Sequence, residues 1–489
     1  MMRHPELFHY LDELRAVLPP DAVMTAEEDL QAYHSDETRI PFPPECVVFP
    51  ETTGQVSEIM KFATRYRIPV TPRGGGSGLT GGALPVQGGI LLVTTRMNRI
   101  LEIDKANMTA TAQPGIILKE FQTVILKEGL FYPPDPNSFE SCCLGGTIAE
   151  NAGGPKTVKY GVTSNYVMGL EVVLPDGEII RTGGKNRKCV AGYDLTKLFI
   201  GSEGTFGVVT EITVRLIGNP EAVRTMVALF PDFRDAARAV AAIMAAKIIP
   251  STLEFLDILA IRLVRKFLNM SVSCAVDYLL LEAGENSAFL LIEVDGLEAE
   301  LEANLREIGR ICMENQAGET RILTTQSERD RIWLVRRSIK TSITAVCKYE
   351  VSEDIVVPIA MIPNMTECLQ VIAKEFDVDI LNYGHFGDGN MHVNILSYEG
   401  TPEHMKKMDK IVARVFDETL KRGGTISGEH GIGVTKADFL ENEVGTRVMQ
   451  LYAGLKNVFD PLGILNPGKM SLDRFQGKIR HGSNMPDTG

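Results

Sequence analysis

The sequence predicts an α+β fold of two domains, and three changes of pattern along the chain lead to this prediction. Up to about residue 220, short β-branched runs alternate with glycine-rich turns and amphipathic helical patterns. After Asn219–Pro220 glycines become sparse, and longer helical patterns separate the strand patterns. From about residue 425 the glycines return. We therefore expect residues 1–219 to form a first domain, 220–424 a second, 425–475 to rejoin the first, and 476–489 to be a disordered tail.

The first domain is expected to alternate strands with helices. Within Thr53–Tyr66, apolar residues recur at i, i+3, i+4 and i+7, which predicts a helix with one buried face. β-branched runs bounded by turn residues predict strands at Cys46–Phe49, Ile68–Val70, Ile90–Val93, Leu170–Leu174 and Val208–Leu216.

The second domain is expected to be a sheet with helices on one face. Phe230 closes a strand pattern, and Leu297–Gln316 has the pattern of a long charged helix. The other expected elements are a helix at Phe233–Ala246 and strands at Ala288–Val294 and Ile355–Pro358. Strands separated by helices, with few glycines, are typical of an antiparallel sheet covered by helices.

Composition and charge exclude several classes of protein. The 489 residues are 44% hydrophobic and carry a net charge of −13, without a Lys/Arg block, which disfavours nucleic acid as a partner. Apolar stretches such as Ala239–Ala246 and Ile355–Ile362 fall far short of the ~20 residues that a membrane span needs. The first residues carry no secretory signal pattern, so we expect a cytoplasmic protein.

The eight cysteines point to reduced thiols. They stand at positions 46, 142, 143, 189, 274, 312, 347 and 368, without any C-x-x-C spacing. This spacing excludes a ferredoxin-like ligand run and a four-cysteine zinc site.

Three glycine-rich loops suggest a site for a long anionic ligand. The segment from Gly74 to Gly82 holds six glycines in nine positions directly after a strand pattern, which suits a nest of backbone N–H groups around a pyrophosphate. A flexible loop is the alternative reading. The spacing matches neither a Rossmann fingerprint nor a P-loop. Together with Gly145–Gly154 and Gly201–Gly207, the loop favours a dinucleotide.

The order of these motifs carries a family resemblance. Arg73–Leu84, Pro134-Asp135-Pro136, Gly145–Gly154, Lys159-Tyr160-Gly161 and Gly201–Gly207 together resemble the flavin domain of the vanillyl-alcohol oxidase and p-cresol methylhydroxylase superfamily. Over about residues 20–470 the chain looks like the FAD-linked 2-hydroxy-acid dehydrogenases, which include the glycolate oxidase catalytic subunit, D-lactate dehydrogenases and D-2-hydroxyglutarate dehydrogenase. The resemblance implies a two-part FAD-binding domain and an α+β substrate domain with an antiparallel sheet.

The resemblance also implies how FAD is bound. The backbone of Arg73–Leu84 is expected at the pyrophosphate, and because Thr71–Pro85 contains no histidine the FAD should be noncovalent. The residues expected to bind FAD are Pro72, Arg73, Gly74, Gly75, Gly76, Ser77, Gly78, Leu79, Thr80, Gly81, Pro134, Asp135, Ser141, Gly145, Gly146, Thr147, Asn151, Gly153, Gly201, Glu203, Gly204, Gly207, Val208 and Asn466.

Two histidine motifs favour a catalytic divalent metal. His385 and His392 stand seven apart across a glycine turn, and Glu429-His430 is flanked by glycines. Two imidazoles and a carboxylate, without a thiolate, suit zinc, with manganese or iron as alternatives; ordinary structural histidines are the competing reading. The resemblance makes His385, His392 and Glu429 the metal ligands and His430 the general base.

The resemblance completes a mechanism. The metal would bind the hydroxyl and carboxylate of the substrate, His430 would take the hydroxyl proton, and the Cα hydride would pass to the flavin N5, giving a 2-keto acid. Arg336 aligns with an arginine that binds the substrate carboxylate, although an arginine on a helix surface is the alternative. Asn394 aligns with a substrate contact.

Two departures bear on the choice of 2-hydroxy acid. Hydroxyglutarate dehydrogenases have a lysine where this chain has Ser352, and a small hydroxyl residue where it has Lys340. Lys340 or Lys348 could substitute for that lysine, but a substrate with one carboxylate, D-lactate or glycolate, is the simpler expectation. D-2-hydroxyglutarate stays as the alternative.

The chain shows no second redox centre, so we expect a separate electron acceptor. This would be an iron–sulfur subunit or an electron-transferring flavoprotein, and a homodimer is left open. Three rival functions remain: a metal-dependent hydrolase, a redox-neutral flavin enzyme related to alkyl-glycerone-phosphate synthase, and a non-catalytic flavoprotein module.

Overall fold

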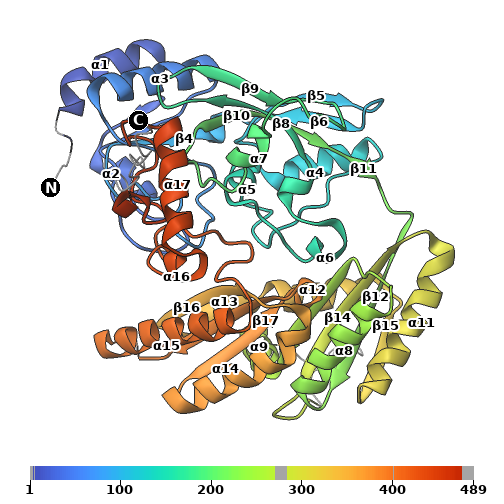
Figure 1. Ribbon diagram of the computed structural model, residues 1–489. Helices are drawn as coiled ribbons and strands as arrows, with labels where there is room; N and C mark the ends of the chain where they lie inside the picture. Colours follow the sequence, from blue (N-terminus) through green and yellow to red (C-terminus); the bar gives the residue numbers. More distant parts are fainter. Residues whose placement is uncertain (1–3, 5, 270–282, 400, 476–489) are drawn as a thin grey trace, which may run out of the picture.

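The computed structural model describes residues 4, 6–269, 283–399 and 401–475. The predicted disordered tail, 476–489, and Cys274 lie outside the described residues. Figure 1 shows two parts, one built mainly from the first half of the chain and one from the large sheet and its helices. Over the described residues, the strands form sheets of four, five, two and seven strands.

The first sheet is mixed, with strand order β1-β2-β4-β3. Its strands are β1 (Val23–Met24), β2 (Cys46–Val48), β3 (Val70–Arg73) and β4 (Ile90–Val93), and α1 (Leu7–Val17), α2 (Glu27–Leu30) and α3 (Thr53–Tyr66) accompany it. The prediction for α3 is confirmed, and the Thr52 hydroxyl caps it by accepting the Gln55 N–H. The expected strand at 68–70 is displaced toward the C-terminus. Because β3 is an edge strand, it can run on through Pro72.

The second sheet is antiparallel, with order β5-β6-β10-β8-β9. Its strands are β5 (Ile100–Asp104), β6 (Thr109–Ala112), β8 (Val167–Val173), β9 (Ile179–Gly183) and β10 (Val208–Arg215). Around it lie α4 (Leu118–Lys127), α5 (Leu144–Glu150), α6 (Thr157–Tyr160), α7 (Leu195–Phe199) and the β7 (Leu130–Phe131) to β11 (Ile217–Gly218) pair. The two sheets match the two-part FAD-binding domain that the sequence predicts.

The large sheet is antiparallel throughout, as predicted, with order β15-β12-β14-β13-β17-β18-β16. Its strands are β12 (Ala222–Phe230), β13 (Thr252–Asp257), β14 (Ala288–Gly296), β15 (Glu319–Leu323), β16 (Tyr349–Val356), β17 (Asp379–Gly384) and β18 (Asn390–Ser397). The strand expected at 355–358 lies further toward the N-terminus, because β16 pairs with β18 over its whole length.

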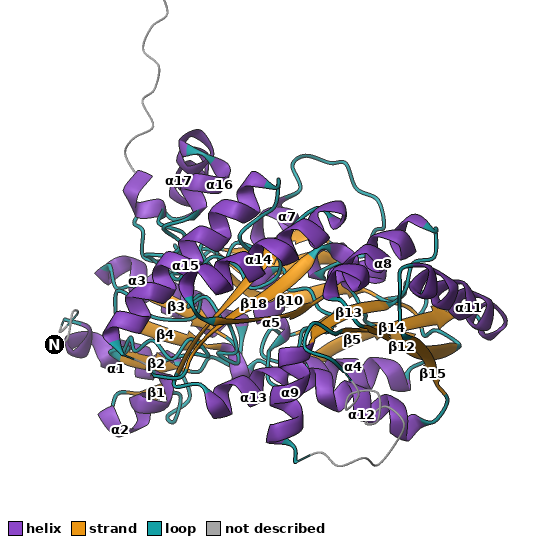
Figure 2. Ribbon diagram, turned by 90° about the horizontal axis from the view of Figure 1, so that it is seen from below, coloured by secondary structure: helices purple, strands orange, loops and turns teal. Residues whose placement is uncertain are grey.

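Helices cover both faces of the large sheet, so the expectation of one covered face is wrong (Figure 2). One face packs against α8 (Phe233–Ala245), α11 (Glu298–Glu314), α14 (Ile362–Phe376) and α15 (Pro402–Lys421). The other packs against α9 (Ile258–Phe267), α12 (Gln326–Arg337) and α13 (Ile339–Val346). The physical reason is visible in β14: Leu290 and Ile292 enter one core while Phe289 and Leu291 enter the other.

The last described segment returns to the first sheet. Thr425 and Ser427 bridge to β16, and Leu465 then bridges to Val70 of β3. Between them lie α16 (Leu440–Val444) and α17 (Thr446–Phe459), drawn in red in Figure 1. The exact domain limits stay a prediction.

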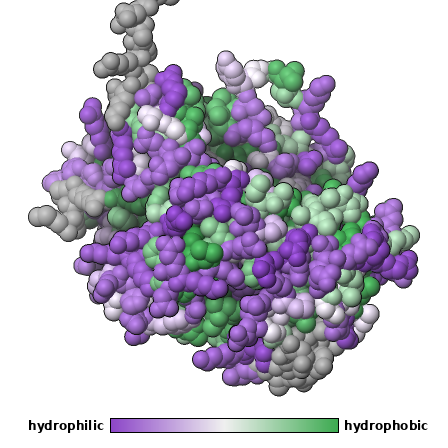
Figure 3. Space-filling model, turned by 60° about the horizontal axis from the view of Figure 1, so that its bottom comes forward, coloured by the Kyte–Doolittle hydropathy of each residue, from purple (hydrophilic) through white to green (hydrophobic). Residues whose placement is uncertain are grey.

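In the described ranges, no helix is both long enough and apolar enough to cross a bilayer. On the face seen in Figure 3, hydrophilic residues surround small, separate hydrophobic patches.

Candidate active site

One cavity of about 310 Å³ joins the glycine loops to the histidine motifs. Its wall includes most of the expected FAD-binding residues: Pro72, Arg73, Gly74, Gly75, Gly76, Ser77, Gly78, Leu79, Ser141, Gly145, Gly146, Thr147, Glu203, Gly204, Gly207 and Val208. Arg336, His392, Glu429 and His430 line the same cavity. The other sequence-predicted residues lie outside this wall: Thr80, Gly81, Pro134, Asp135, Asn151, Gly153, Gly201, His385, Asn394 and Asn466.

The first loop has features that would suit a pyrophosphate. A Cβ on Gly75 would lie 2.3 Å from the Ser141 carbonyl oxygen, so only glycine allows this close approach. Gly76 adopts a φ of +70°, which favours glycine. Among the described residues, no acceptor is found for the N–H groups of Gly76, Ser77 and Gly78. A Cβ on Gly78 or Gly146 would enter open space, so these residues fit a bound dinucleotide.

Some expected FAD-binding residues also hold the loops together. The Thr80 hydroxyl donates to the His430 carbonyl at 3.0 Å, and the Thr80 carbonyl accepts the Val434 N–H. The Asn466 side chain donates to the carbonyls of Gly82 and Glu203 at 3.0 and 2.6 Å. The first loop is therefore fixed to the segment that carries the Glu429-His430 pair.

Others make local contacts near the cavity. The Asn151 side chain accepts the Ser164 N–H at 2.8 Å, and the Gly201 N–H donates to the Ile148 carbonyl at 3.0 Å. A Cβ on Gly153 would lie 3.0 Å from Glu429 Oε2. Pro134 accepts a hydrogen bond from Gln122, and Asp135 pairs with Lys156 on the wall of a second cavity.

The three predicted metal ligands lie together, with both histidines directed at one oxygen of Glu429. His385 follows β17 and His392 lies in β18, so the turn between these paired strands brings the two imidazoles together. Their Nε2 atoms lie 3.2 and 3.4 Å from Glu429 Oε1. Glu429 Oε2 is buried without a hydrogen-bond partner among the described residues. Because two imidazoles and a carboxylate meet with an unpaired oxygen, the set fits a divalent metal.

The surroundings shift the pKa values of these two histidines in opposite directions. Burial lowers the pKa of His392 to about 3, and the charge of His385 acts in the same direction. Burial also disfavours the charged form of His385, but the carboxylates of Glu254 and Glu429 outweigh it and raise the pKa well above its usual range. A metal ion bound between them would require both imidazoles in the neutral form.

Glu254 was not found by sequence analysis. It lies fully buried in β13, where it contacts His385 Nδ1 and accepts from Nε of Arg336. Burial raises the pKa of this carboxyl, but Arg336 and His385 outweigh it and lower the pKa to about 2. Glu254 therefore orients the Nε2 atom of His385 toward Glu429. A carboxylate between Leu253 and Phe255, two apolar residues of the strand, was the signal that could have found it.

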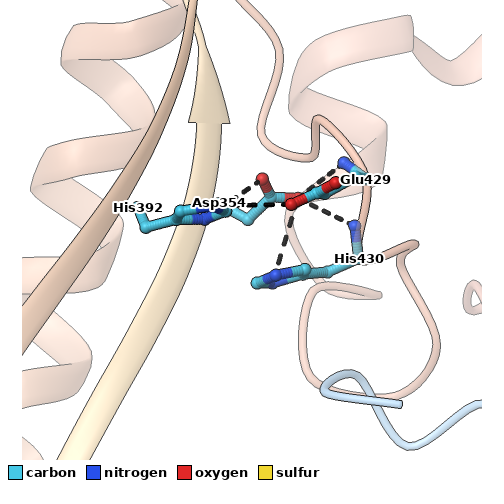
Figure 4. Close-up of side chains that lie close together, drawn as sticks. All are labelled: Asp354, His392, Glu429 and His430. Atoms are coloured by element: carbon cyan, nitrogen blue, oxygen red, sulfur yellow. Dashed lines mark hydrogen bonds and ion pairs between the residues drawn. The ribbon is translucent and has the colours of Figure 1, made fainter. Parts of the chain in front are cut away.

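Asp354 was also missed. Its Oδ2 accepts the N–H groups of Gly428, Glu429 and His430 at 2.8 to 2.9 Å, and it lies opposite His392 across the β16–β18 ladder. Figure 4 shows its contacts with the imidazoles of His392 and His430, which are 3.9 Å long. Burial raises the pKa of Asp354, but His430 and Lys436 outweigh it, and the pKa lies well below its usual range.

Asp354, His392, Glu429 and His430 also form a compact donor group, with one atom of each within 4.8 Å of the others. We favour the set with His385, because Asp354 Oδ2 is already occupied by three backbone N–H groups and Oδ1 by the Asn390 amide.

His430 has the environment of a base. Its ring stacks nearly parallel to that of His392, 5.4 Å away, and its Nδ1 lies 3.9 Å from Asp354. Burial lowers the pKa of His430, and Asp354 opposes this only in part. The imidazole is therefore neutral near pH 7 and can accept a proton.

Arg336 is buried, which excludes the alternative of a surface arginine. Its guanidinium lies 4.7 Å from the centre of the Tyr383 ring, and both residues line the cavity. Lys340 and Ser352 also line the cavity, with Lys340 paired to Glu350. Asn394 is fully buried, and its side chain donates to the His392 carbonyl at 3.4 Å.

Comparison with known proteins identifies the family. The family model "FAD linked oxidases, C-terminal domain" matches residues 219–470, and the model "FAD binding domain" matches residues 44–183. The chain is 41% identical to the glycolate oxidase subunit GlcD of Bacillus subtilis, over 87% of this chain and 89% of that protein. It is 34% identical to the D-lactate dehydrogenase of Anaerostipes hadrus, over 95% and 97%.

Solved structures confirm the fold. A p-cresol methylhydroxylase with bound substrate matches with a TM-score of 0.79 at 19% identity, covering 95% of this chain and 96% of the other. An alkyldihydroxyacetonephosphate synthase matches with a TM-score of 0.73 at 21% identity, covering 94% and 84%. With the fold, the loops and the two family matches together, the chain belongs to the FAD-linked oxidases and is an FAD-linked oxidoreductase.

Proposed function

We propose that this enzyme oxidises a small D-2-hydroxy acid, D-lactate or glycolate, to the 2-keto acid. The observation that carries the proposal is the shared cavity, where the FAD-binding loops meet Arg336, Glu429 and His430. The names of the relatives, glycolate oxidase and D-lactate dehydrogenase, support this choice of substrate.

Each residue has a distinct task in this reaction. The Arg336 guanidinium binds the substrate carboxylate, while Glu254 and Tyr383 hold the arginine in place. His430 takes the proton of the substrate hydroxyl, and the nearby Asp354 carboxylate stabilises the imidazolium that forms. Bound FAD supplies the two-electron oxidant that accepts the hydride from Cα.

His385, His392 and Glu429 would hold one divalent metal, with zinc favoured over manganese and iron. When bound, this ion supplies a Lewis acid that makes the substrate hydroxyl more acidic.

A His392→Ala variant should lose the metal and keep FAD. A His430→Asn variant should keep both and reduce its flavin roughly 10²–10⁴-fold more slowly. Metal analysis and anaerobic flavin spectra check this pair; equal metal loss in both variants would make His430 a ligand instead.

We also propose that FAD is noncovalent and that its electrons pass to a separate protein, an iron–sulfur subunit or an electron-transferring flavoprotein. The absence of histidine from residues 71–85 supports noncovalent binding, and the cysteine spacing supports an external acceptor. Acid precipitation should release all the flavin. Turnover should be fast with an artificial dye and slow with O₂ alone; yellow pellets or fast oxidase activity would contradict these points.

The choice of substrate is tested by product analysis with an artificial dye. D-Lactate should give pyruvate, or glycolate should give glyoxylate. With a dye that accepts two electrons, one keto acid should form for each dye molecule reduced. D-2-Hydroxyglutarate is the second candidate, because Lys340 places a cation on the cavity wall. Its pairing with Glu350 disfavours a second carboxylate there, so we expect D-2-hydroxyglutarate to react more slowly. The opposite order would reverse the substrate assignment.

A further inference from the structure

A second cavity, of about 280 Å³, lies next to the active site. Its wall combines α4 and the loop around Phe139 from the first half of the chain with Trp333, Arg336 and Arg337 of α12. We propose that this cavity is a binding site for small carboxylates, through which the anionic substrate reaches Arg336. The inference rests on the proposed function for the identity of the substrate.

The wall of the second cavity is rich in cationic side chains. Lys119, Lys156, Arg336 and Arg337 line the cavity, whereas Asp135 supplies the carboxylate. Three of these cations have partners: Lys156 pairs with Asp135, Arg336 with Glu254, and Lys119 with Glu140. For Arg337, no carboxylate of the described residues lies within 4.0 Å. Its guanidinium is therefore available to an external anion.

Aromatic rings hold Arg337 in position. Its guanidinium carbon lies 5.1 Å from the centre of the Phe139 ring and 5.3 Å from that of Trp333. The Trp333 indole N–H donates to Glu293 Oε1 at 2.9 Å, which fixes the indole. Contacts to ring faces leave the N–H groups in the guanidinium plane free, so Arg337 keeps its fork for a carboxylate.

The second cavity adjoins the first. Arg336 and Asn137 line both cavities, so these side chains form the wall between them. Arg336 and Arg337 are consecutive residues of α12. An anion held by Arg337 is thus close to the arginine that binds the substrate carboxylate in the proposed reaction.

The kinetic test compares Arg337→Gln with Arg65→Gln. Arg65 is a matched control, because it is also an exposed arginine over an aromatic ring, Tyr66, and lies outside both cavities. We expect Arg337→Gln to lower the second-order rate constant of anaerobic flavin reduction by D-lactate roughly 5–10-fold at low salt, with little salt dependence left. The limiting rate at saturation should stay within about twofold. Arg337→Lys, which keeps the charge, should retain the salt dependence.

The chain's single tryptophan gives a readout that needs no turnover. Because Trp333 lines the cavity, sodium acetate should change its fluorescence more than sodium chloride at equal ionic strength. Arg337→Gln should weaken this response at least fivefold, and Arg65→Gln should not change it. An Arg337→Gln enzyme with unchanged acetate response and unchanged salt dependence overturns the inference. If instead acetate binds as expected but no 2-hydroxy acid reduces the flavin, the proposed function fails and the carboxylate site stands.

Discussion

Glu254 contacts both a proposed metal ligand and the proposed carboxylate-binding arginine. This buried carboxylate couples the two binding tasks, because one side chain fixes the orientation of His385 and balances the charge of Arg336. Sequence analysis found the histidines and Arg336 because they stand in local motifs. It missed Glu254 and Asp354, because each is a single acid whose partners are brought to it only by strand pairing and loop packing.

Glu254→Gln should affect both metal binding and stability. Losing the charge that orients His385 is expected to weaken metal affinity about 10–100-fold. Leaving Arg336 buried without its carboxylate should lower the free energy of unfolding by about 3–5 kcal/mol. Metal titration and denaturant unfolding measure the two effects. Glu171→Gln serves as a control, since Glu171 is buried but pairs with the exposed Arg181; metal affinity within twofold of wild type in Glu254→Gln would contradict the role.

Asp354 should contribute to stability in a pH-dependent way. Its pKa in the folded protein lies well below the usual 3.8, so the ionised form is stabilised by folding. That contribution is fully present above the unfolded pKa and is lost as pH falls through the folded pKa. The difference in unfolding free energy between wild type and Asp354→Asn should therefore be constant above about pH 5 and shrink at lower pH.

Denaturant unfolding at several pH values measures this difference. Asp12→Asn, which removes an exposed carboxylate, is the control and should show little difference at any pH. A difference for Asp354→Asn that grows as the pH is lowered would have the wrong sign and would refute the assignment.

At the scale of elements, α5 lies between β7 and β8 in the chain and lines the cavity. Local pattern predicted α3 to the residue, because a helix is decided by contacts along its own length. The number of covered faces of the large sheet was predicted wrongly, since the short apolar run of β14 fits several packings until its neighbours are known. The loops of the cavity were predictable as glycine motifs, but Thr80 and Asn466 act through partners more than 250 residues away.

Gly146→Ala separates helix stability from FAD binding. Gly146 lies within α5, and a Cβ there would meet no protein atom within 4 Å, so alanine should stabilise the apoprotein by up to about 1 kcal/mol. The same methyl group enters the cavity, so FAD affinity should fall at least several-fold. Gly218→Ala, also in open space but away from the cavity, should leave FAD binding unchanged. Unfolding of the apoprotein and FAD titration test this; undiminished FAD affinity in Gly146→Ala would contradict the placement of the cofactor.

At the scale of the whole molecule, the site exists only where the two parts meet. Lys159 and Tyr160 of α6 both contact Asp295 of β14, with 2.8 Å between the Tyr160 hydroxyl and Asp295 Oδ2. Glu203 of the third glycine loop accepts the N–H groups of Ile432 and Gly433 at 2.8 and 2.7 Å. These contacts set the glycine loops opposite His430 and Arg336.

The central claim is that this cavity brings FAD and a small 2-hydroxy acid together for hydride transfer. The most direct measurement is the absorbance of the purified flavoprotein after anaerobic mixing with D-lactate or glycolate, with no acceptor present. The account predicts that at least one of these acids bleaches the flavin completely, with one keto acid formed per flavin. If neither acid bleaches a flavin that dithionite still reduces, the account is contradicted.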